Sequence, residues 1–215
     1  MERHAFALKI KKGQLANYRK TLGEVWGDIK GLADKYNASN FSIWAADLFV
    51  FGYCETEAPV ELTEELAAEI AVLDNKFSGI YDWISEPGKP MRLMYHQYGE
   101  VQQNKELVHH RVFMTHLING DTEEYKARHD AILLPPEEEY THKETNNFTI
   151  WNAGDYIFGY AEIDSTLGSE ETEEQKADTT KWETSMLEIM EWITNDVDWL
   201  TGIYHGNCKR IAHYK

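Results

Sequence analysis

Residues 40–55, NFSIWAADLFVFGYCE, and residues 147–162, NFTIWNAGDYIFGYAE, are two copies of one sequence set 107 residues apart. Nine of the sixteen positions are identical, and the same offset places Tyr18 on Tyr125. A repeat of this length exceeds the roughly 20 to 50 residues of solenoid units. We therefore predict that a whole small domain is duplicated and fused within a chain of 215 residues.

Both copies show the same order of predicted elements. Alternation of apolar and polar residues indicates strands, and apolar residues at three- and four-residue spacing indicate helices. The first copy has predicted strands at 4–11, 41–44, 48–55 and 91–98 and helices at 15–32 and 63–83. The second has strands at 110–118, 147–151, 156–163 and 208–214 and helices at 121–139, bent or ended near Pro135, and 173–194. The resulting order, β-α-β-β-α-β, is that of the ferredoxin-like split βαβ motif.

These elements predict an α+β fold of two ferredoxin-like units, residues 1–99 and 108–215, joined by a polar linker. Such a unit has helices on one face of its sheet, so the other face must be covered. A second identical unit can cover it, sheet against sheet. We therefore predict an intrachain pseudo-dimer, a pseudo-dimeric α/β barrel that can be monomeric because one chain holds both halves.

Charge and composition exclude several classes of partner. A net charge of −16 argues against binding to nucleic acid and to anionic membranes. No apolar run approaches the roughly 18 residues of a membrane span, and the N-terminus lacks a signal-peptide pattern. Only two cysteines occur, Cys54 and Cys208, which favours a reducing cytoplasm. No phosphate-binding glycine motif or metal-ligand spacing is present, so we predict neither cofactor nor metal.

The two copies differ at one position that can carry chemistry. Tyr125 and His129 are four residues apart and share one face of a predicted helix. The first copy has Tyr18 and Leu22 at these places, so the face is apolar there. A histidine in place of a core leucine needs a polar partner or lines a cavity. Proton transfer near neutral pH is one role open to it, and a plain bond to a backbone carbonyl is the other.

Several motifs resemble the L-rhamnose mutarotase family. They are residues 3–6 (RHAF) and 40–44 (NFSIW) in the first copy, and residues 124–129 (EYKARH) and 147–151 (NFTIW) in the second. The family pattern is Tyr-x-x-x-His on the first helix, Asn-Tyr-x-Ile-aromatic on the second strand and a Trp-Trp pair on the second helix. The resemblance implies a ferredoxin-like dimeric barrel and exchange of sugar anomers without a cofactor.

Carried over to the second copy, the resemblance implies a catalytic acid at His129 and a substrate contact at Tyr125. Phe148 stands in place of a sugar-binding tyrosine. Trp182 matches the first tryptophan of the pair, although a core aromatic is the alternative, and Glu183 replaces the second. The resemblance implies a deoxy or related aldose as substrate, and the altered residues put L-rhamnose itself in doubt.

In the first copy, Leu22 replaces the histidine, Phe41 the tyrosine, and Phe77 with Ser78 the tryptophan pair. The leading hypothesis is therefore an isomerase, a sugar mutarotase-like epimerase with one working site in the C-terminal half. A non-catalytic module that binds a small sugar is the second hypothesis. Another dimeric-barrel activity, such as a cofactor-free monooxygenase, is the third, because a fold alone does not choose a function.

Overall fold

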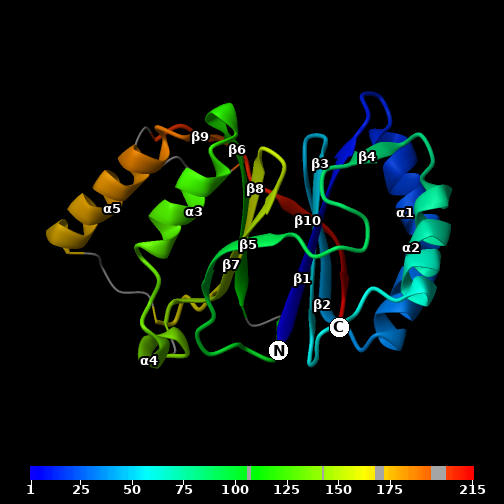
Figure 1. Ribbon diagram of the computed structural model, residues 1–215, viewed down its shortest axis with the longest axis horizontal. Coiled ribbons are helices and arrows are strands. Elements are labelled where there is room, and N and C mark those ends of the chain that lie inside the picture. The colour runs from blue at the N-terminus through cyan, green and yellow to red at the C-terminus, as the bar shows by residue number, and fades with distance from the viewer. Residues whose placement is uncertain (106–107, 142, 168–171, 195–201) are drawn as a thin grey trace. The chain divides into compact units, whose positions relative to one another are not determined.

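The computed structural model describes residues 1–105, 108–141, 143–167, 172–194 and 202–215. The chain divides into two compact units, unit 1 being Met1–Met91 with Lys209–Lys215 and unit 2 being Arg92–Cys208. Each contains one five-stranded antiparallel sheet (Figure 1). The predicted α+β class with two ferredoxin-like units is confirmed. The packing of one sheet against the other stays a prediction. Among the described helices, none is long and apolar enough to cross a membrane.

Unit 1 has its strands in the order β10-β2-β3-β1-β4. Helices α1 and α2 lie on one face of this sheet (Figure 1). The elements are β1 (Glu2–Ile10), α1 (Leu15–Lys35), β2 (Ser39–Ala46), β3 (Phe49–Thr56), α2 (Glu64–Lys76), β4 (Tyr81–Trp83) and β10 (Lys209–Tyr214).

Unit 2 has the equivalent order β5-β7-β8-β6-β9, with α3 and α5 on one face of the sheet (Figure 1). The predicted helix at 121–139 is two helices, of which the first ends at Asp130, ahead of the prolines. The elements are β5 (Arg92–Gln97), β6 (His109–Leu117), η1 (Ile118–Gly120), α3 (Thr122–Asp130), α4 (Pro136–Glu139), β7 (Thr145–Ala153), β8 (Tyr156–Ile163), α5 (Glu173–Met186) and β9 (Met190–Thr194).

The long helices predicted at 63–83 and 173–194 are wrong at their C-terminal ends. Each stops early and is followed by a short strand, β4 or β9. These strands pair with the first strand of their own unit, Trp83 opposite Leu8 and Trp192 opposite Thr115. They are the fourth strands of the ferredoxin-like order. Their apolar residues continue the helical spacing, so periodicity did not reveal the change of structure.

The strands predicted to close each unit are exchanged between the sheets. β5, expected within 1–99, pairs with β7 of unit 2, and β10, expected within 108–215, pairs with β2 of unit 1. The compact units therefore depart from the predicted boundaries by one strand each. Alternation identifies a strand and its buried face, but it does not identify the neighbour with which an edge strand pairs.

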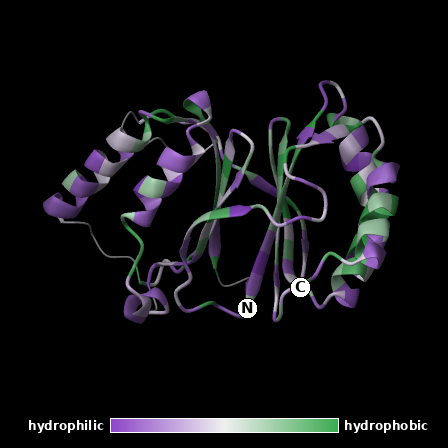
Figure 2. Ribbon diagram, in the orientation of Figure 1, coloured by the Kyte–Doolittle hydropathy of each residue, from purple (hydrophilic) through white to green (hydrophobic). Residues whose placement is uncertain are grey.

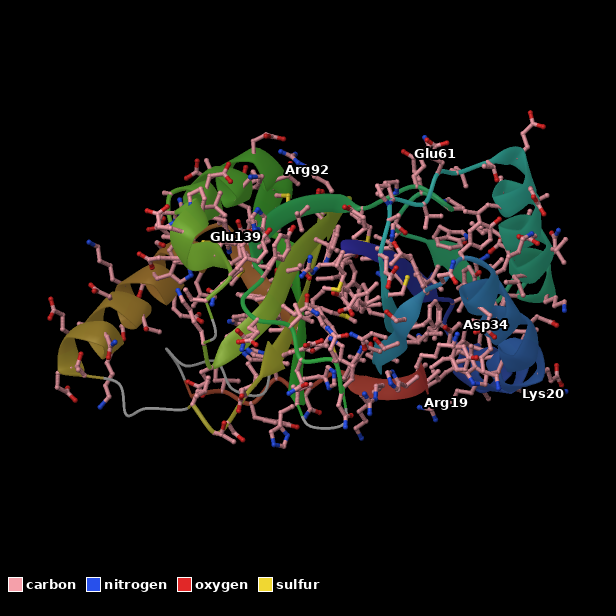
Figure 3. The ribbon with its side chains drawn as sticks, turned by 90° about the horizontal axis from the view of Figure 1, so that it is seen from below. Arg19, Lys20, Asp34, Glu61, Arg92 and Glu139 are labelled. Carbon is pink, nitrogen blue, oxygen red and sulfur yellow. The ribbon has the colours of Figure 1, made fainter. Side chains whose placement is uncertain are left out.

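Each exchanged strand is tied to the first helix of the unit that receives it. Tyr214 of β10 donates its hydroxyl to Asp34 of α1 at 3.0 Å. Arg92 of β5 donates to Glu123 of α3, with Nη2 2.9 Å from Oε2. Figure 3 labels Asp34 and Arg92 in the two units. Each exchanged strand is thus hydrogen-bonded to a carboxylate of that helix, near the end of α1 in unit 1 and near the start of α3 in unit 2.

The repeated Asn and Glu of the two matching segments build one buried motif twice. Asn40 and Asn147 adopt positive φ angles of 50° and 48°, which asparagine tolerates better than most residues. Each side chain donates to a buried carboxylate at 3.0 Å, Asn40 to Glu55 and Asn147 to Glu162. In unit 2 the carboxylate also forms a buried ion pair with Lys105 at 2.7 Å.

The repeated glycine is required by a phenylalanine on the neighbouring strand. A Cβ at Gly159 would lie 2.1 Å from the ring of Phe113, and one at Gly52 would lie 2.0 Å from the ring of Phe6. The ring can cross the adjacent strand only because the side chain is missing there. In unit 2 this holds Phe113 on the helix-covered side of the sheet, where the site lies.

The helices of the two units differ in polarity, although they occupy equivalent places. Figure 2 shows much green, hydrophobic colour on α2, whereas α3 and α5 are mostly purple or white. The buried residues of α3 are Tyr125 and His129, and those of α5 are Glu183 and Met186. Unit 2 therefore directs polar groups toward its core at positions where a simple structural helix would carry apolar ones.

Candidate active site

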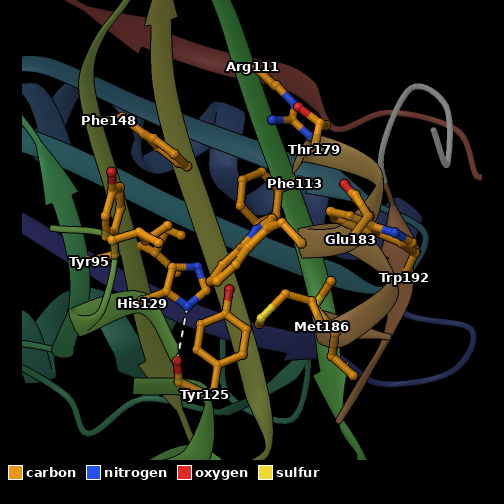
Figure 4. A pocket seen from close by; sticks show the side chains of 14 residues that line it. Tyr95, Arg111, Phe113, Tyr125, His129, Phe148, Thr179, Glu183, Met186 and Trp192 are labelled. Carbon is orange, nitrogen blue, oxygen red and sulfur yellow. Dashed lines mark hydrogen bonds between the residues drawn. The ribbon is translucent and has the colours of Figure 1, made fainter. Parts of the chain in front are cut away.

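A pocket of about 150 Å³ lies within unit 2, between its sheet and the helices α3 and α5 (Figure 4). A cavity of about this volume can admit a molecule as large as benzene, so there is room for one six-membered ring. The structure brings all five predicted site residues to its wall. They are Tyr125, His129, Phe148, Trp182 and Glu183.

His129 presents one nitrogen to the pocket. Its Nδ1 lies 3.0 Å from the carbonyl oxygen of Tyr125, one turn earlier on α3. A carbonyl only accepts, so Nδ1 carries the hydrogen and Nε2 keeps its lone pair. Within the described part of the chain, Nε2 has no hydrogen-bond partner. Burial lowers the pKa of His129 to about 4, so the imidazole is neutral at pH 7.

Three aromatic rings hold the imidazole in place. Tyr125 stacks on it with ring centroids 4.3 Å apart, and Trp182 meets it edge to face at 5.1 Å. Tyr95 makes a second edge contact at 5.4 Å. The rings exclude water and account for the low pKa of His129, because the charged imidazolium would be poorly solvated here.

Tyr125 is 2% exposed and is a hydrogen-bond donor, not a base. Burial raises the pKa of its phenol above the usual range, the Glu183 carboxylate raises it further, and Arg111 partly opposes them. Among the described residues the hydroxyl has no hydrogen-bond partner. Figure 4 shows it directed toward the other side chains that line the pocket. Tyr125 can therefore offer its proton to an oxygen of a bound molecule.

Tyr95 is a pocket residue that sequence reasoning missed. It lies on β5, the strand contributed by the first half of the sequence, in register with Ile150 of β7. Its hydroxyl contacts Gln97 at 3.5 Å, and its ring meets Phe148 at 5.4 Å. The second copy therefore completes its pocket with a residue of the first copy. Tyr95 could have been predicted as a pocket residue only if the pairing of β5 with β7 had been known.

Charged side chains also line the pocket. Arg111 comes from β6, with its guanidinium carbon 5.1 Å from the centroid of the Phe113 ring. Glu183 comes from α5 and is 8% exposed. Sequence analysis did not identify Arg111. The equivalent residue of the first copy is His4, and no motif includes this position. The pocket thus combines apolar walls with a few polar groups, the usual composition of a small-molecule site.

Phe148 and Trp182 form apolar walls. Phe148 of β7 packs edge to face against Phe113 at 6.3 Å, and it lacks the hydroxyl of the tyrosine that the resemblance implies at this place. Trp182 of α5 is partly buried against the hydrophobic core of unit 2 and also lines the pocket. It is therefore a core aromatic and a pocket wall at the same time.

The second helix of each unit, α2 in unit 1 and α5 in unit 2, aligns with its counterpart in a different register from the one predicted from the sequence. The N-caps Thr63 and Thr172 are 109 residues apart and make the same capping bond to the third helical residue. At this offset Trp182 and Glu183 correspond to Leu73 and Asp74. The predicted correspondence with Phe77 and Ser78, at an offset of 105 residues, is therefore wrong, because the capped helix starts fix the offset here at 109.

Unit 1 has different side chains at most of the equivalent positions. Tyr18 and Leu22 are buried in its core, and Leu73 packs against the same core cluster. Asp74 is tied internally, because it accepts from the hydroxyl of Tyr81 at 2.5 Å and from Nε1 of Trp83 at 2.8 Å. At two of the positions that carry polar groups in unit 2, unit 1 thus has an apolar residue, Leu22, or a carboxylate that is already bonded, Asp74, whereas Tyr18 keeps the hydroxyl of Tyr125.

In the part of the chain that the structure describes, no three His, Cys, Asp or Glu side chains gather closely enough to hold a metal ion.

Comparison with known proteins identifies one family. Neither the curated proteins nor the solved structures contain a match to the chain. The family described as L-rhamnose mutarotase matches residues 3–74 and 110–204, one segment in each half and together well over half of the sequence. The chain therefore belongs to the L-rhamnose mutarotase family.

Proposed function

We propose that unit 2 binds an aldose in this pocket and exchanges its α and β anomers by proton transfer through His129. The observation that supports this most directly is the state of the imidazole. It is buried and neutral, its Nδ1 is fixed on the Tyr125 carbonyl, and its Nε2 faces a pocket large enough for one pyranose ring.

In the proposed reaction His129 acts first as a base. Nε2 takes the proton of the anomeric hydroxyl, the carbonyl forms at the anomeric carbon, and the bond to the ring oxygen breaks. The imidazolium then returns the same proton to the ring oxygen, so atoms and charge balance. The aldehyde rotates about its bond to the neighbouring carbon, and ring closure reverses the steps. One group can serve both oxygens because both are attached to the anomeric carbon.

The low pKa of His129 refines its role. A neutral imidazole cannot donate from Nε2 until it has accepted a proton, so the catalytic acid implied by the resemblance is proposed here as a base first and an acid second. Tyr125 remains protonated and is proposed to donate a hydrogen bond to the substrate. Such a bond would stabilise the charge that develops on the ring oxygen.

The walls of the pocket support a deoxy or related aldose as the substrate. Phe148, Trp182 and Met186 offer apolar surface, which suits a sugar face or a methyl substituent. The polar groups at Glu183 and Arg111 can then orient the remaining hydroxyls.

Binding without catalysis is the second candidate. It is favoured by the pKa of about 4 at His129, because acid–base catalysis is most efficient when the pKa lies near the working pH. In that case the pocket would hold the sugar while His129 and Tyr125 served only as hydrogen-bonding groups.

Saturation-transfer and exchange NMR on L-rhamnose, L-fucose and D-glucose distinguish the two candidates. We expect the exchange rate between anomers to rise in proportion to protein concentration for at least one of these sugars. Saturation transfer to a sugar without faster exchange would support the binding candidate. Neither binding nor exchange for any of the three would contradict both.

A further inference from the structure

The proposed proton transfer uses the groups on only one side of the pocket. In Figure 4, His129 and Tyr125 lie on one side of the view, and Glu183 and Trp192 lie on the other. Both of the latter line the pocket. Trp192 is on β9, the short strand that periodicity did not reveal.

Unit 1 shows what the same positions do when no ligand is involved. Trp83 of β4 is the counterpart of Trp192, and Asp74 of α2 is the counterpart of Glu183. Trp83 donates its indole N–H to Asp74 at 2.8 Å, and Tyr81 donates its hydroxyl to the same oxygen at 2.5 Å. The polar atoms of this corner are satisfied within the protein.

Unit 2 has lost this arrangement. Nε1 of Trp192 is buried, and among the residues that the structure describes it has no hydrogen-bond partner. Met190, which cannot donate, replaces Tyr81. The indole is nevertheless held in place by an edge contact with Phe113, with centroids 5.6 Å apart. A buried N–H without an acceptor is destabilising, and such groups are rare unless a ligand or water completes them.

We propose that the Trp192 N–H donates to an oxygen of the sugar bound in the pocket, and that Glu183 accepts from a hydroxyl of the same sugar. A hydroxyl suits both partners, because it can accept from an N–H and donate to a carboxylate. The Glu183 carboxylate would repel an anionic substituent at this position. The inference rests on the proposed function and narrows its substrate to a neutral sugar with a hydroxyl at this side of the pocket.

The test compares Trp192→Phe with the matched control Trp83→Phe, each in the full chain. Both substitutions keep an aromatic ring and remove one N–H. With L-rhamnose as the probe, we expect Trp192→Phe to weaken binding about 3- to 10-fold, the worth of one hydrogen bond. Without sugar, its Tm should fall less than that of Trp83→Phe, because both variants lose ring packing but only Trp83→Phe loses an internal hydrogen bond. Trp83→Phe should show the larger fall in Tm and bind L-rhamnose with parental affinity.

Monodeoxy analogues of L-rhamnose identify the hydroxyl concerned. One analogue should bind the parent protein more weakly than L-rhamnose does. Trp192→Phe should not weaken the binding of this analogue further, because the analogue lacks the hydroxyl that accepts from the Trp192 N–H. If the parent binds L-rhamnose and Trp192→Phe binds it equally well, the inference is overturned while the proposed function stands. If the parent binds neither L-rhamnose nor L-fucose nor D-glucose, the proposed function fails and the inference fails with it.

Discussion

The two units are built from the same repeated sequence, yet they carry different side chains at the place where unit 2 has its pocket. Unit 1 places Leu22 on α1 and ties Asp74 to Tyr81 and Trp83. Unit 2 places His129 on α3 and has Glu183 in the pocket wall. The folds stay equivalent because strand pairing and the buried Asn–Glu motif are retained in both. A fold can thus keep its framework while few side chains decide whether a site exists.

The largest expected effect comes from removing the histidine that distinguishes the units. His129→Ala should lower catalysed anomer exchange by roughly 10²- to 10⁴-fold, the usual contribution of acid–base assistance. Tyr125→Phe should be milder, because it removes one hydroxyl and keeps the ring. Exchange NMR measures the rates.

Leu22→Ala is the matched control for this prediction, because it truncates the equivalent position in unit 1 and should leave exchange unchanged. Thermal melts check that both variants fold. Full activity of His129→Ala would eliminate the proposed proton shuttle.

The second effect concerns an ion pair that unit 2 forms at the repeated motif. Lys105 and Glu162 pair at 2.7 Å with side chains 8% and 1% exposed. Lys105→Met should destabilise the protein by about 3–5 kcal/mol, because the carboxylate would stay buried without its cation. Chemical denaturation measures the loss. Lys35→Met, which removes an exposed lysine of unit 1 paired with Glu65, is the control and should change stability little.

The double variant Lys105→Met with Glu162→Gln tests the reason for that loss. Removing the charge should recover part of the stability. A Lys105→Met protein as stable as the parent would show that the pair contributes nothing to unit 2.

The third effect is a pH dependence that unit 2 has and unit 1 lacks at the equivalent position. The pKa of His129 is about 4 in the fold against 6.5 for a free histidine. The unfolded chain therefore binds this proton more readily, so stability is complete above about pH 6.5 and is lost as the pH falls toward 4. Complete loss of this contribution lowers the free energy of unfolding by about 3 kcal/mol.

His129→Leu, which installs the residue of unit 1, should remove this part of the pH dependence. Denaturation at pH 7 and at pH 4.5 measures the difference between variant and parent. NMR titration of the imidazole gives its pKa directly, and a midpoint near 6.5 would contradict the buried, neutral state described here.

The smallest expected effect distinguishes the carboxylate of Asp74, which is bonded within unit 1, from that of Glu183, which lines the pocket of unit 2. Asp74→Asn should destabilise the protein by about 1–3 kcal/mol, because two donors lose a charged acceptor. Glu183→Gln should alter sugar affinity more than stability. Melting curves and sugar titrations on both variants measure this. The proposed contrast between the units would be wrong if Glu183→Gln destabilised the protein as much as Asp74→Asn and left its affinity for sugar unchanged.

The sequence by itself determined the duplication, the fold class and the face of α3 that carries Tyr125 and His129. These follow from local patterns: a repeat at constant offset, a strand period of two and a helical spacing of four residues. The same comparison indicated that Leu22 and His129 differ in chemistry, and all five predicted site residues line one pocket.

Only the tertiary structure decided which strands pair and which further residues reach the pocket. The exchange of β5 and β10 brings Tyr95 from the first half of the sequence to His129 of the second. The short strand β9 brings Trp192. Backbone hydrogen bonding between strands is nearly independent of side-chain identity, so an edge strand carries no local mark of its partner. The pocket depends on those pairings, and for that reason its full set of residues could not be obtained from periodicity.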